Sequence, residues 1–397
     1  MKYSEKAMNV SPSPTLSIDS LAKKMKEAGE DVIGFGAGEP DFDTPNNIKY
    51  AAIDAIIRGY TKYTPVAGIP KLKEAIVNYY ETNYNLKYTP NQVVVSNGAK
   101  HSLMNVFFAI LNKDDEVLLP SPYWVTYPEL IKLADGKAIE IPTTKETNFK
   151  INKQLLENYT SNKTKALVLN SPSNPTGMVY TYEELKDIVE FCVEKEIFII
   201  SDEIYDKLIY DNYTHVSPAV FSEKAKELTI IVNGVSKSYA MTGWRIGYTL
   251  SNLELANIMS NLQSHMTSNP NSIAQYAALE ALNGNQDSLN KMLIEFSKRR
   301  DLIYNLVNSI DGLSALKPNG AFYIMVDLTN IIGKSYNNQV IDSANTFAKI
   351  LLETKKVAVV PSEGFGINNF IRLSYATSEK NIINGLKRIE EFIKELQ

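Results

Sequence analysis

The sequence predicts an α/β protein with a parallel sheet enclosed by helices, followed by a second, smaller α+β lobe. Between about residues 45 and 250, helix-like segments alternate with strand-like ones, the pattern of parallel strands joined by crossover helices. The strand-like runs are continuously apolar, which indicates burial on both faces of the sheet. After about residue 250 the rhythm changes to long helices and a few short apolar runs.

The candidate strands and helices of the first region have clear boundaries. Six apolar runs are predicted strands: VVVS (93–96), EVLLP (116–120), KALVLN (165–170), FIISDE (198–203), TIIVNG (229–234) and RIGYTL (245–250). Thr44 and Pro45 suit the N-cap and first-turn positions of the helix NNIKYAAIDAIIRG, and Gly59 suits its end. Thr181 and Glu184 have the spacing of a capping box at the start of another helix.

The remaining segments predict the smaller lobe. Its expected helices are NSIAQYAALEALNG, 288–310, one near 339–354 and the terminal SEKNIINGLKRIEEFIKEL, and its apolar runs lie in LSALKPNGAFYIMVDL, VAVVP and NFIRLSYA. A helix near 17–28 belongs to the first 45 residues, which we expect to pack against this lobe. We therefore expect a large domain over 46–280 and a discontinuous small domain made of 1–45 and 281–397.

Composition narrows the classes of function. The 397 residues carry a net charge of −4, so no basic field recruits nucleic acid or an anionic membrane, and small-molecule partners are expected. Cys192 is the single cysteine, which fits a reducing compartment. The start MKYSEKAMNV lacks the apolar core of a signal peptide and no run is long enough to span a membrane, so we expect a cytoplasmic protein. The three histidines are scattered without ligand spacing, and we expect no metal.

Polar residues follow the predicted strands at the point where each strand ends. Asn174 lies in SPSNPTG after KALVLN, Asp202 and Tyr205 follow FIIS, and Ser236 and Lys237 follow TIIVNG. Ligands of open parallel sheets bind outside the carboxyl ends of the strands. These positions therefore place an amide, a carboxylate, a phenol and an amine at one edge of the sheet.

A lysine at such an edge is a candidate nucleophile. Desolvation disfavours its ammonium form, and a neutral amine can form an imine with an aldehyde. Pyridoxal 5′-phosphate fits this set of residues. Lys237 would form the imine, Asp202 would hold the ring nitrogen, and Asn174 and Tyr205 would donate to the ring oxygen.

A phosphate site is predicted beside these residues. Gly98-Ala99-Lys100 follows the first strand and opens a helix, where free N–H groups and the helix dipole favour an anion. Arg245, eight residues beyond Lys237, would add a charge-assisted contact.

Several motifs, in order along nearly the whole chain, resemble those of the class I, fold type I pyridoxal-phosphate aminotransferases, and most of all the prokaryotic type Ib aspartate aminotransferases. They are AGEPDFDTP (37–45), YTPVAGIPKLKEAI (63–76), SPYWVTY (121–127), NSPSNPTG (170–177), SDEIYDKLIY (201–210), SKSYAMTGWRIGY (236–248) and NFIRLSYA (369–376). The resemblance implies a mostly parallel, seven-stranded sheet in the large domain.

The resemblance also implies roles for further residues. Trp124 matches the aromatic residue that stacks on the cofactor ring, and Tyr63 matches a tyrosine that reaches the phosphate of the neighbouring subunit, which requires a homodimer. Gly38 and Arg372 match the positions that hold the substrate α-carboxylate. Lys100 matches the residue that meets the side-chain carboxylate of a dicarboxylic substrate.

One position departs from the pattern of many relatives. Three residues before the lysine, where those relatives have a phosphate-binding serine, this chain has Gly234. Ser236 and Ser238 are the alternatives for this contact.

The resemblance implies transfer of the amino group of L-aspartate to 2-oxoglutarate, in ping-pong order, through the lysine-bound cofactor. Aromatic, prephenate and alanine-type aminotransferases are alternatives on the same scaffold, because they would differ mainly in the residues that meet the substrate side chain. A cofactor-dependent β-lyase is an alternative of another enzyme class.

Overall fold

A seven-stranded sheet forms the centre of the computed structural model, which describes residues 3–11 and 14–397. The strands are β2 (Val93–Ser96), β3 (Glu116–Ser121), β4 (Lys137–Pro142), β5 (Thr164–Asn170), β6 (Phe198–Asp202), β7 (Thr229–Gly234) and β8 (Gly247–Leu250). Their order is β2-β8-β7-β6-β5-β3-β4. Only β8 runs in the opposite direction to the other six strands, so the prediction of a mostly parallel sheet is confirmed.

The six predicted strands all form, and a seventh was missed. β4 lies at the edge of the sheet and most of its residues are exposed or half-buried, so KAIEIP has no continuous apolar run. The predicted strand at 245 begins later, at Gly247, because Arg245 adopts a left-handed conformation with φ of 58°.

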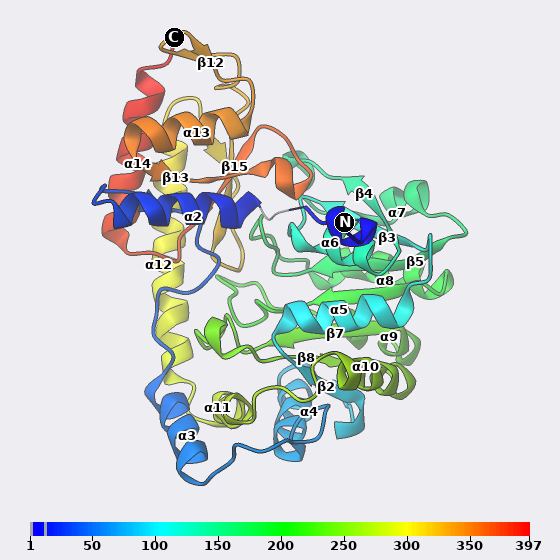
Figure 1. The fold of residues 1–397 in the computed structure, drawn as a ribbon. Helices are drawn as coiled ribbons and strands as arrows, with labels where there is room; N and C mark the ends of the chain where they lie inside the picture. Colours follow the sequence, from blue (N-terminus) through cyan, green and yellow to red (C-terminus); the bar gives the residue numbers. More distant parts are fainter. Residues whose placement is uncertain (1–2, 12–13) are drawn as a thin grey trace.

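Helices cover both faces of this sheet (Figure 1). The helices between residues 46 and 283 are α3 (Asn46–Ile57), α4 (Pro70–Tyr84), α5 (Ala99–Ile110), α6 (Thr126–Leu133), α7 (Lys153–Tyr159), α8 (Tyr182–Glu194), α9 (Glu223–Leu228), α10 (Leu253–Met266) and α11 (Ser272–Asn283), of which α3 packs on α11 rather than on the sheet. The capping box of Thr181 and Glu184 is confirmed at the start of α8. The capping role predicted for Thr44 is wrong. Pro45 is the N-cap of α3, and the Thr44 hydroxyl donates instead to Ala240 O at 2.6 Å.

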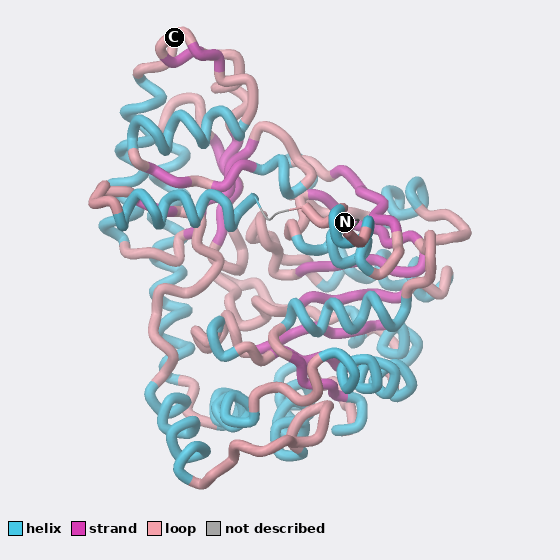
Figure 2. The backbone as a smooth tube through the Cα atoms, in the orientation of Figure 1, coloured by secondary structure: helices cyan, strands magenta, loops and turns pink. Residues whose placement is uncertain are grey.

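A smaller antiparallel sheet of order β14-β15-β10-β9 lies beside the large one, at upper left in Figure 2. Its part of the chain contains α12 (Asp287–Ser309), β9 (Ser314–Ala315), β10 (Tyr323–Asp327), β11 (Ser335–Tyr336), β12 (Gln339–Val340), α13 (Ala344–Lys355), β13 (Val357–Ala358), β14 (Val360–Pro361), β15 (Phe370–Ser374) and α14 (Glu379–Lys394). The helix expected near 339–354 begins only at Ala344, because residues 335–340 form the β11–β12 hairpin.

The N-terminal segment contributes α1 (Glu5–Met8), α2 (Pro14–Glu27) and β1 (Ile33–Gly34). β1 pairs in parallel with β13, so residues more than 300 positions apart lie side by side. α1 instead lies by α6 (Figure 1), and Lys6 Nζ is 2.7 Å from Asp135 Oδ2. The N-terminal segment thus contacts both parts of the molecule, and the division at residues 46 and 281 stays a prediction.

One apolar core runs from the large sheet into the smaller lobe. Tyr205, Phe296 and Phe322 belong to the same buried cluster, and the ring centroids of Phe296 and Phe322 are 5.5 Å apart. This shared core fixes the residues of the small sheet against the carboxyl ends of β5, β6 and β7. Within the described residues, no helix is long and apolar enough to cross a membrane.

Candidate active site

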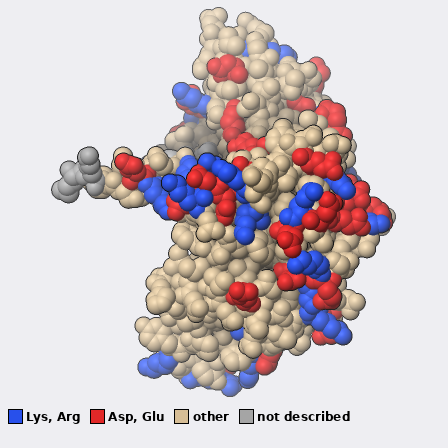
Figure 3. Space-filling view, turned by 90° about the vertical axis from the view of Figure 1, so that its right-hand side faces the viewer, with Lys and Arg blue, Asp and Glu red and all other residues tan. Residues whose placement is uncertain are grey.

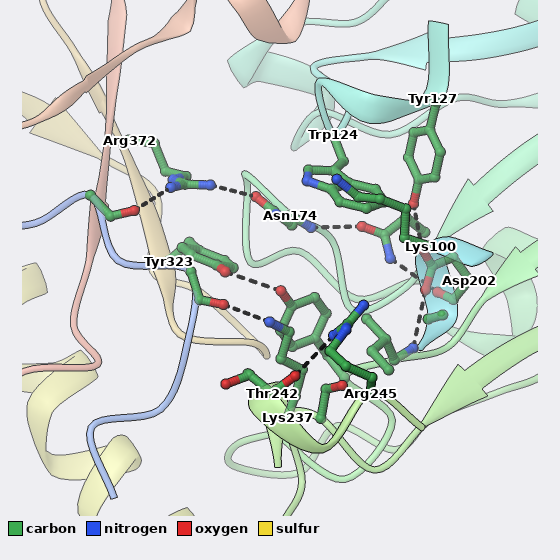
Figure 4. Close-up of a pocket in the computed structure, with 17 residues that line it drawn as sticks. Lys100, Trp124, Tyr127, Asn174, Asp202, Lys237, Thr242, Arg245, Tyr323 and Arg372 are labelled. Atoms are coloured by element: carbon green, nitrogen blue, oxygen red, sulfur yellow. Dashed lines mark hydrogen bonds between the residues drawn. The ribbon is translucent and has the colours of Figure 1, made fainter. Parts of the chain in front are cut away.

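A cavity of about 330 Å³ lies where the carboxyl ends of β5, β6 and β7 face the small sheet (Figure 4). The residues that line it are Gly36, Gly38, Ala99, Lys100, Trp124, Tyr127, Asn170, Asn174, Asp202, Ile204, Tyr205, Ser236, Lys237, Thr242, Arg245, Tyr323 and Arg372. Four of these side chains are cationic at neutral pH in their ordinary form and one is a carboxylate. The cavity is therefore suited to ligands that carry several negative charges.

Most of the residues predicted from the sequence meet in this cavity. Those that line it are Gly38, Ala99, Lys100, Trp124, Asn174, Asp202, Tyr205, Ser236, Lys237, Arg245 and Arg372. Gly98 does not line the cavity, because it lies behind the guanidinium of Arg245. Tyr63 lies outside and is 90% exposed.

Lys237 is held in the turn after β7. Its Nζ donates a hydrogen bond to Gly38 O at 2.5 Å. Burial lowers the pKa of Lys237 to about 8, although the Glu39 carboxylate opposes this effect. A substantial fraction of the amine is therefore unprotonated slightly above neutral pH, as a nucleophile or general base requires.

Asp202 ends β6 and is almost fully buried. Its Oδ2 accepts a hydrogen bond from the Tyr127 hydroxyl at 2.6 Å, and its Oδ1 accepts one from the backbone N–H of Ile204 at 3.2 Å. Burial raises the pKa of Asp202 to about 6, against the effect of these two donors. The carboxyl group is thus fixed in position, and a protonated partner in the cavity would stabilise its charged form.

Arg372 lies on β15, 3% exposed. Its Nη1 donates to Asn174 Oδ1 at 3.0 Å and its Nη2 donates to Gly36 O at 2.8 Å, while its Nε is buried and has no hydrogen-bond partner among the described residues. A buried guanidinium without a carboxylate partner is suited to binding an anionic ligand.

The side chain of Arg245 lies against the start of α5, where an anion site was predicted. Arg245 Nη1 donates to Thr242 O at 2.9 Å and Nη2 donates to Asn97 O at 3.3 Å. Gly98 has a φ of +85°, and a Cβ at this position would lie 2.4 Å from Arg245 Nη2. A side chain at position 98 would therefore displace the arginine from the N-terminus of the helix.

The structure explains the glycine found at position 234. A Cβ there would lie 2.8 Å from Ile246 O and 2.9 Å from the Cα of Gly247, because β7 and β8 approach closely at this point. A serine would push the strands apart. Ser236 lines the cavity, whereas Ser238 is buried away from it, so Ser236 is better placed for the expected phosphate contact.

Six lining residues were not predicted: Gly36, Tyr127, Asn170, Ile204, Thr242 and Tyr323. Asn170 had a usable signal, because it is the polar residue that closes the run KALVLN. Tyr127 lies three residues after Trp124, in the first turn of α6. Tyr323 had no signal, because it begins an apolar strand far along the chain.

Comparisons with known proteins agree with this geometry. The family model described as "Aminotransferase class I and II" matches residues 30–389. The chain belongs to this family. An aspartate aminotransferase of Bacillus sp. (strain YM-2) is 50% identical over 97% of each chain. A probable aspartate/prephenate aminotransferase of Aquifex aeolicus is 48% identical over 98% of each. A crystal structure of the aspartate aminotransferase from Rhizobium meliloti superposes with a TM-score of 0.97, at 40% identity over the full length of both chains.

Class I and II aminotransferases use pyridoxal 5′-phosphate, and the donor set of this cavity fits that cofactor. The amine of Lys237 has a lowered pKa, and the buried carboxyl group of Asp202 has no cationic partner within hydrogen-bond distance among the described residues. The glycine at 98 and the Arg245 guanidinium leave an anion site at the start of α5. The cavity therefore offers a group for the aldehyde, the ring nitrogen and the phosphate.

Proposed function

We propose that this protein is an aspartate aminotransferase, which moves the amino group of L-aspartate to 2-oxoglutarate and gives oxaloacetate and L-glutamate. The names of its relatives support this proposal. The observation that carries it is the presence of Arg372 and Lys100 in one cavity with Lys237. Two cations beside the reactive amine suit a substrate with two carboxylates.

The chain's own residues would hold the cofactor in this arrangement. Lys237 would form the covalent bond to the aldehyde carbon, Asp202 would accept a hydrogen bond from the protonated ring nitrogen, and Trp124 would pack on the ring. Asn174 and Tyr205 donate to the ring oxygen. The phosphate is held by Ala99, Ser236 and Arg245, with Gly98 keeping the arginine at the start of α5.

The same residues would carry out the proton transfer. When bound, the cofactor supplies an electron-poor ring that accepts the electron pair of the substrate's Cα–H bond. The Nζ of Lys237, once free, takes the proton from the substrate Cα. Arg372 binds the α-carboxylate and so orients this bond, with Gly38 beside it, while Lys100 meets the side-chain carboxylate. One cavity serves both substrates in turn, so a ping-pong order follows.

Lys100 is well placed to meet a side-chain carboxylate. Its Nζ lies 5.0 Å from the centroid of the Trp124 ring, on the wall of the cavity. Burial, together with the nearby charge of Arg245, lowers the pKa of Lys100. An added carboxylate would relieve both effects.

Prephenate is a second candidate substrate, because the Aquifex aeolicus relative is named for aspartate and prephenate together. Prephenate is also a dicarboxylic acid, so Arg372 and Lys100 would meet its two carboxylates in the same way.

The test is a panel of amino donors mixed with the purified, cofactor-loaded protein, followed by the change in cofactor absorbance as it takes up the amino group. We expect rapid conversion by aspartate and glutamate and slow conversion by tyrosine and alanine. Prephenate is then supplied as the amino acceptor. Equal rates with all four donors would contradict the preference for dicarboxylic substrates.

Lys237→Ala tests the assignment of the reactive amine. We expect turnover to fall by about a hundredfold to ten-thousandfold, the range for loss of a general acid–base group. Lys226→Ala is the control, since Lys226 pairs with Glu223 on the surface away from the cavity. Unchanged turnover in Lys237→Ala would show that the amine is not required.

A homodimer is part of this proposal, because Tyr63 would reach the phosphate site of a second copy. Apolar side chains are exposed on α3, including Tyr50, Ile53 and Ile57, and Leu253 and Ile258 are exposed on α10. Charged side chains are sparse over the lower left of the face in Figure 3. We expect a dimer in sedimentation equilibrium, and weaker cofactor binding in Tyr63→Phe; a monomeric active protein would contradict both.

A further inference from the structure

Tyr323, on β10 of the small sheet, contacts a residue from the other half of the cavity. Its side chain is 1% exposed, and its hydroxyl lies 3.0 Å from the hydroxyl of Tyr205. Tyr205 lies in the turn after β6 of the large sheet, so the hydrogen bond between the two hydroxyls joins the two parts of the molecule that enclose the cavity (Figure 4). A Cβ on Gly38 would lie 3.5 Å from the Tyr323 oxygen, so this hydroxyl is also next to the segment that accepts from Lys237.

The ring of Tyr323 makes a second contact, with the proposed carboxylate-binding residue. Arg372 Cζ lies 4.5 Å from the centroid of the ring. In the register of β10 and β15, Tyr323 is opposite Ser374 and Arg372 is opposite Met325, so Tyr323 and Arg372 are diagonal neighbours on one face. The guanidinium of Arg372 therefore packs on the face of the Tyr323 ring in a cation–π contact.

The direction of the hydroxyl–hydroxyl bond follows from proton counting. A tyrosine hydroxyl has one proton to donate. If Tyr205 donates its proton to the ring oxygen of the cofactor, it can only accept in the 3.0 Å contact, and Tyr323 must be the donor. Hydrogen bonds in such a chain polarise one another, so the bond from Tyr323 strengthens the bond that Tyr205 donates.

We propose that Tyr323 is a positioning residue for both the cofactor and the substrate. Its hydroxyl donates to Tyr205 and so sets the strength of the hydrogen bond to the cofactor's ring oxygen, while its ring holds the guanidinium of Arg372 for the substrate carboxylate. This inference rests on the proposed function. The charged groups that face the tyrosine pair are Arg372 from β15, Asp202 from β6 and Lys237 from the turn after β7.

Two substitutions separate the two contacts. Tyr323→Phe removes the hydroxyl and keeps the ring under Arg372, whereas Tyr323→Leu removes both. Tyr375→Phe is the matched control, because Tyr375 is a buried tyrosine of the same lobe whose hydroxyl donates to Ala321 O at 3.2 Å, outside the cavity. Each variant is loaded with pyridoxal 5′-phosphate, and the absorbance of the bound cofactor is titrated against pH.

For Tyr323→Phe we expect the midpoint of the absorbance titration to rise by roughly half to one pH unit, because the ring oxygen is less well stabilised as an anion. We expect kcat to fall about twofold to tenfold, with KM for aspartate nearly unchanged. For Tyr323→Leu, which also lacks the hydroxyl, we expect the same titration midpoint as for Tyr323→Phe. Because this variant also lacks the ring under Arg372, we expect its KM for aspartate to rise about threefold to thirtyfold. Tyr375→Phe should match the wild type in all three quantities.

A double-mutant cycle with Tyr205→Phe guards against a general loss of structure. In that background Tyr323→Phe should not move the midpoint further, because the chain of hydrogen bonds is already broken. A midpoint in Tyr323→Phe equal to that of the control, or a full shift in the Tyr205→Phe background, overturns the role of the hydroxyl. An unchanged KM in Tyr323→Leu overturns the role of the ring. A wild-type protein that binds no pyridoxal phosphate overturns this inference and the proposed function together.

Discussion

Asp202 is held by two donors from different elements, the Tyr127 hydroxyl from α6 and the backbone N–H of Ile204. These contacts fix its carboxyl group without help from any ligand. The Asp202 carboxyl group therefore needs no rearrangement to bind its proposed partner, the ring nitrogen of the cofactor. Such preorganised electrostatic contacts contribute more to the transition state than to binding.

Asp202→Asn therefore tests the electronic role of this residue. The amide keeps the size of the side chain but cannot hold a proton on the ring nitrogen, so we expect turnover to fall roughly a hundredfold or more while cofactor content changes little. Asp206→Asn is the control, since Asp206 is also a buried carboxylate but accepts from Tyr79 and Tyr84, away from the cavity. Measurement of kcat and of bound cofactor per chain decides the matter. A parallel loss of both would point to a binding role alone.

At the residue level, the sequence predicted those site residues that follow strand ends or stand in the matched motifs. Lys237, Asp202 and Asn174 lie in the cavity as expected. Tyr323 could not be predicted, because only the β10–β15 register places it beside Arg372. The contact between Tyr323 and Tyr205 depends on the packing of two sheets, which no local pattern records.

Strand β8 brings a glycine against the start of α5. A Cβ on Gly247 would lie 2.2 Å from Ala99 N and 2.4 Å from the carbonyl carbon of Gly98, both backbone atoms. Backbone atoms cannot move aside as the end of a flexible side chain can. Because position 247 of β8 has no side chain, the N-terminus of α5 can lie directly against this strand.

Gly247→Ala should displace the start of α5 and weaken the proposed phosphate site. Overpacking of this kind costs about 1–3 kcal/mol, shared between the stability of the fold and the affinity for the cofactor. Gly34→Ala is the control, because a Cβ there meets nothing within 4 Å. The dissociation constant for pyridoxal phosphate and the urea midpoint of unfolding are measured together. An affinity and midpoint equal to those of Gly34→Ala would show that α5 is not constrained by this contact.

At the level of elements, prediction succeeded where strands are buried on both faces and failed at the edge of the sheet. β6 and β7 are continuous apolar runs, whereas β4 is mostly exposed or half-buried and reads as polar chain. Thr44 misled because its residue type favours a helix cap, yet its hydroxyl bonds to Ala240 O and accepts from Trp244 Nε1 at 3.0 Å. Tertiary partners decided both cases.

At the level of the molecule, burial in the cavity shifts the pKa values of two ionisable groups in opposite directions. Burial raises the pKa of Asp202 to about 6 and lowers the pKa of Lys237 to about 8. Without cofactor, both side chains are largely charged between these values, although the fold favours the neutral form of each. The raised pKa of Asp202 contributes stability that is complete below its unfolded value of about 3.9 and is lost as pH rises through about 6. The lowered pKa of Lys237 makes stability rise again as pH increases from about 8 towards 10.4.

The cofactor-free protein should accordingly lose stability between about pH 4 and pH 6 relative to Asp202→Asn, in which this titration is absent. Pyridoxal phosphate at a thousandfold excess over its dissociation constant should increase the free energy of unfolding of the wild type by about 4 kcal/mol. Its midpoint temperature of unfolding should rise accordingly. Thermal unfolding from pH 4 to pH 9, with and without cofactor, provides the measurement. Curves for wild type and Asp202→Asn that run parallel over the whole range would contradict the assignment.

The pairing of β1 with β13 has a consequence for the order in which the protein is made. β1 has no strand partner until Val357 and Ala358 leave the ribosome, whereas the sheet that carries Asp202 and Lys237 is complete at Leu250. Domains generally fold as units during synthesis, the N-terminal ones first. The nascent chain therefore assembles the cofactor-facing wall before Arg372 exists, and Ile33 and Gly34 can pair only after Val357 and Ala358 have been made.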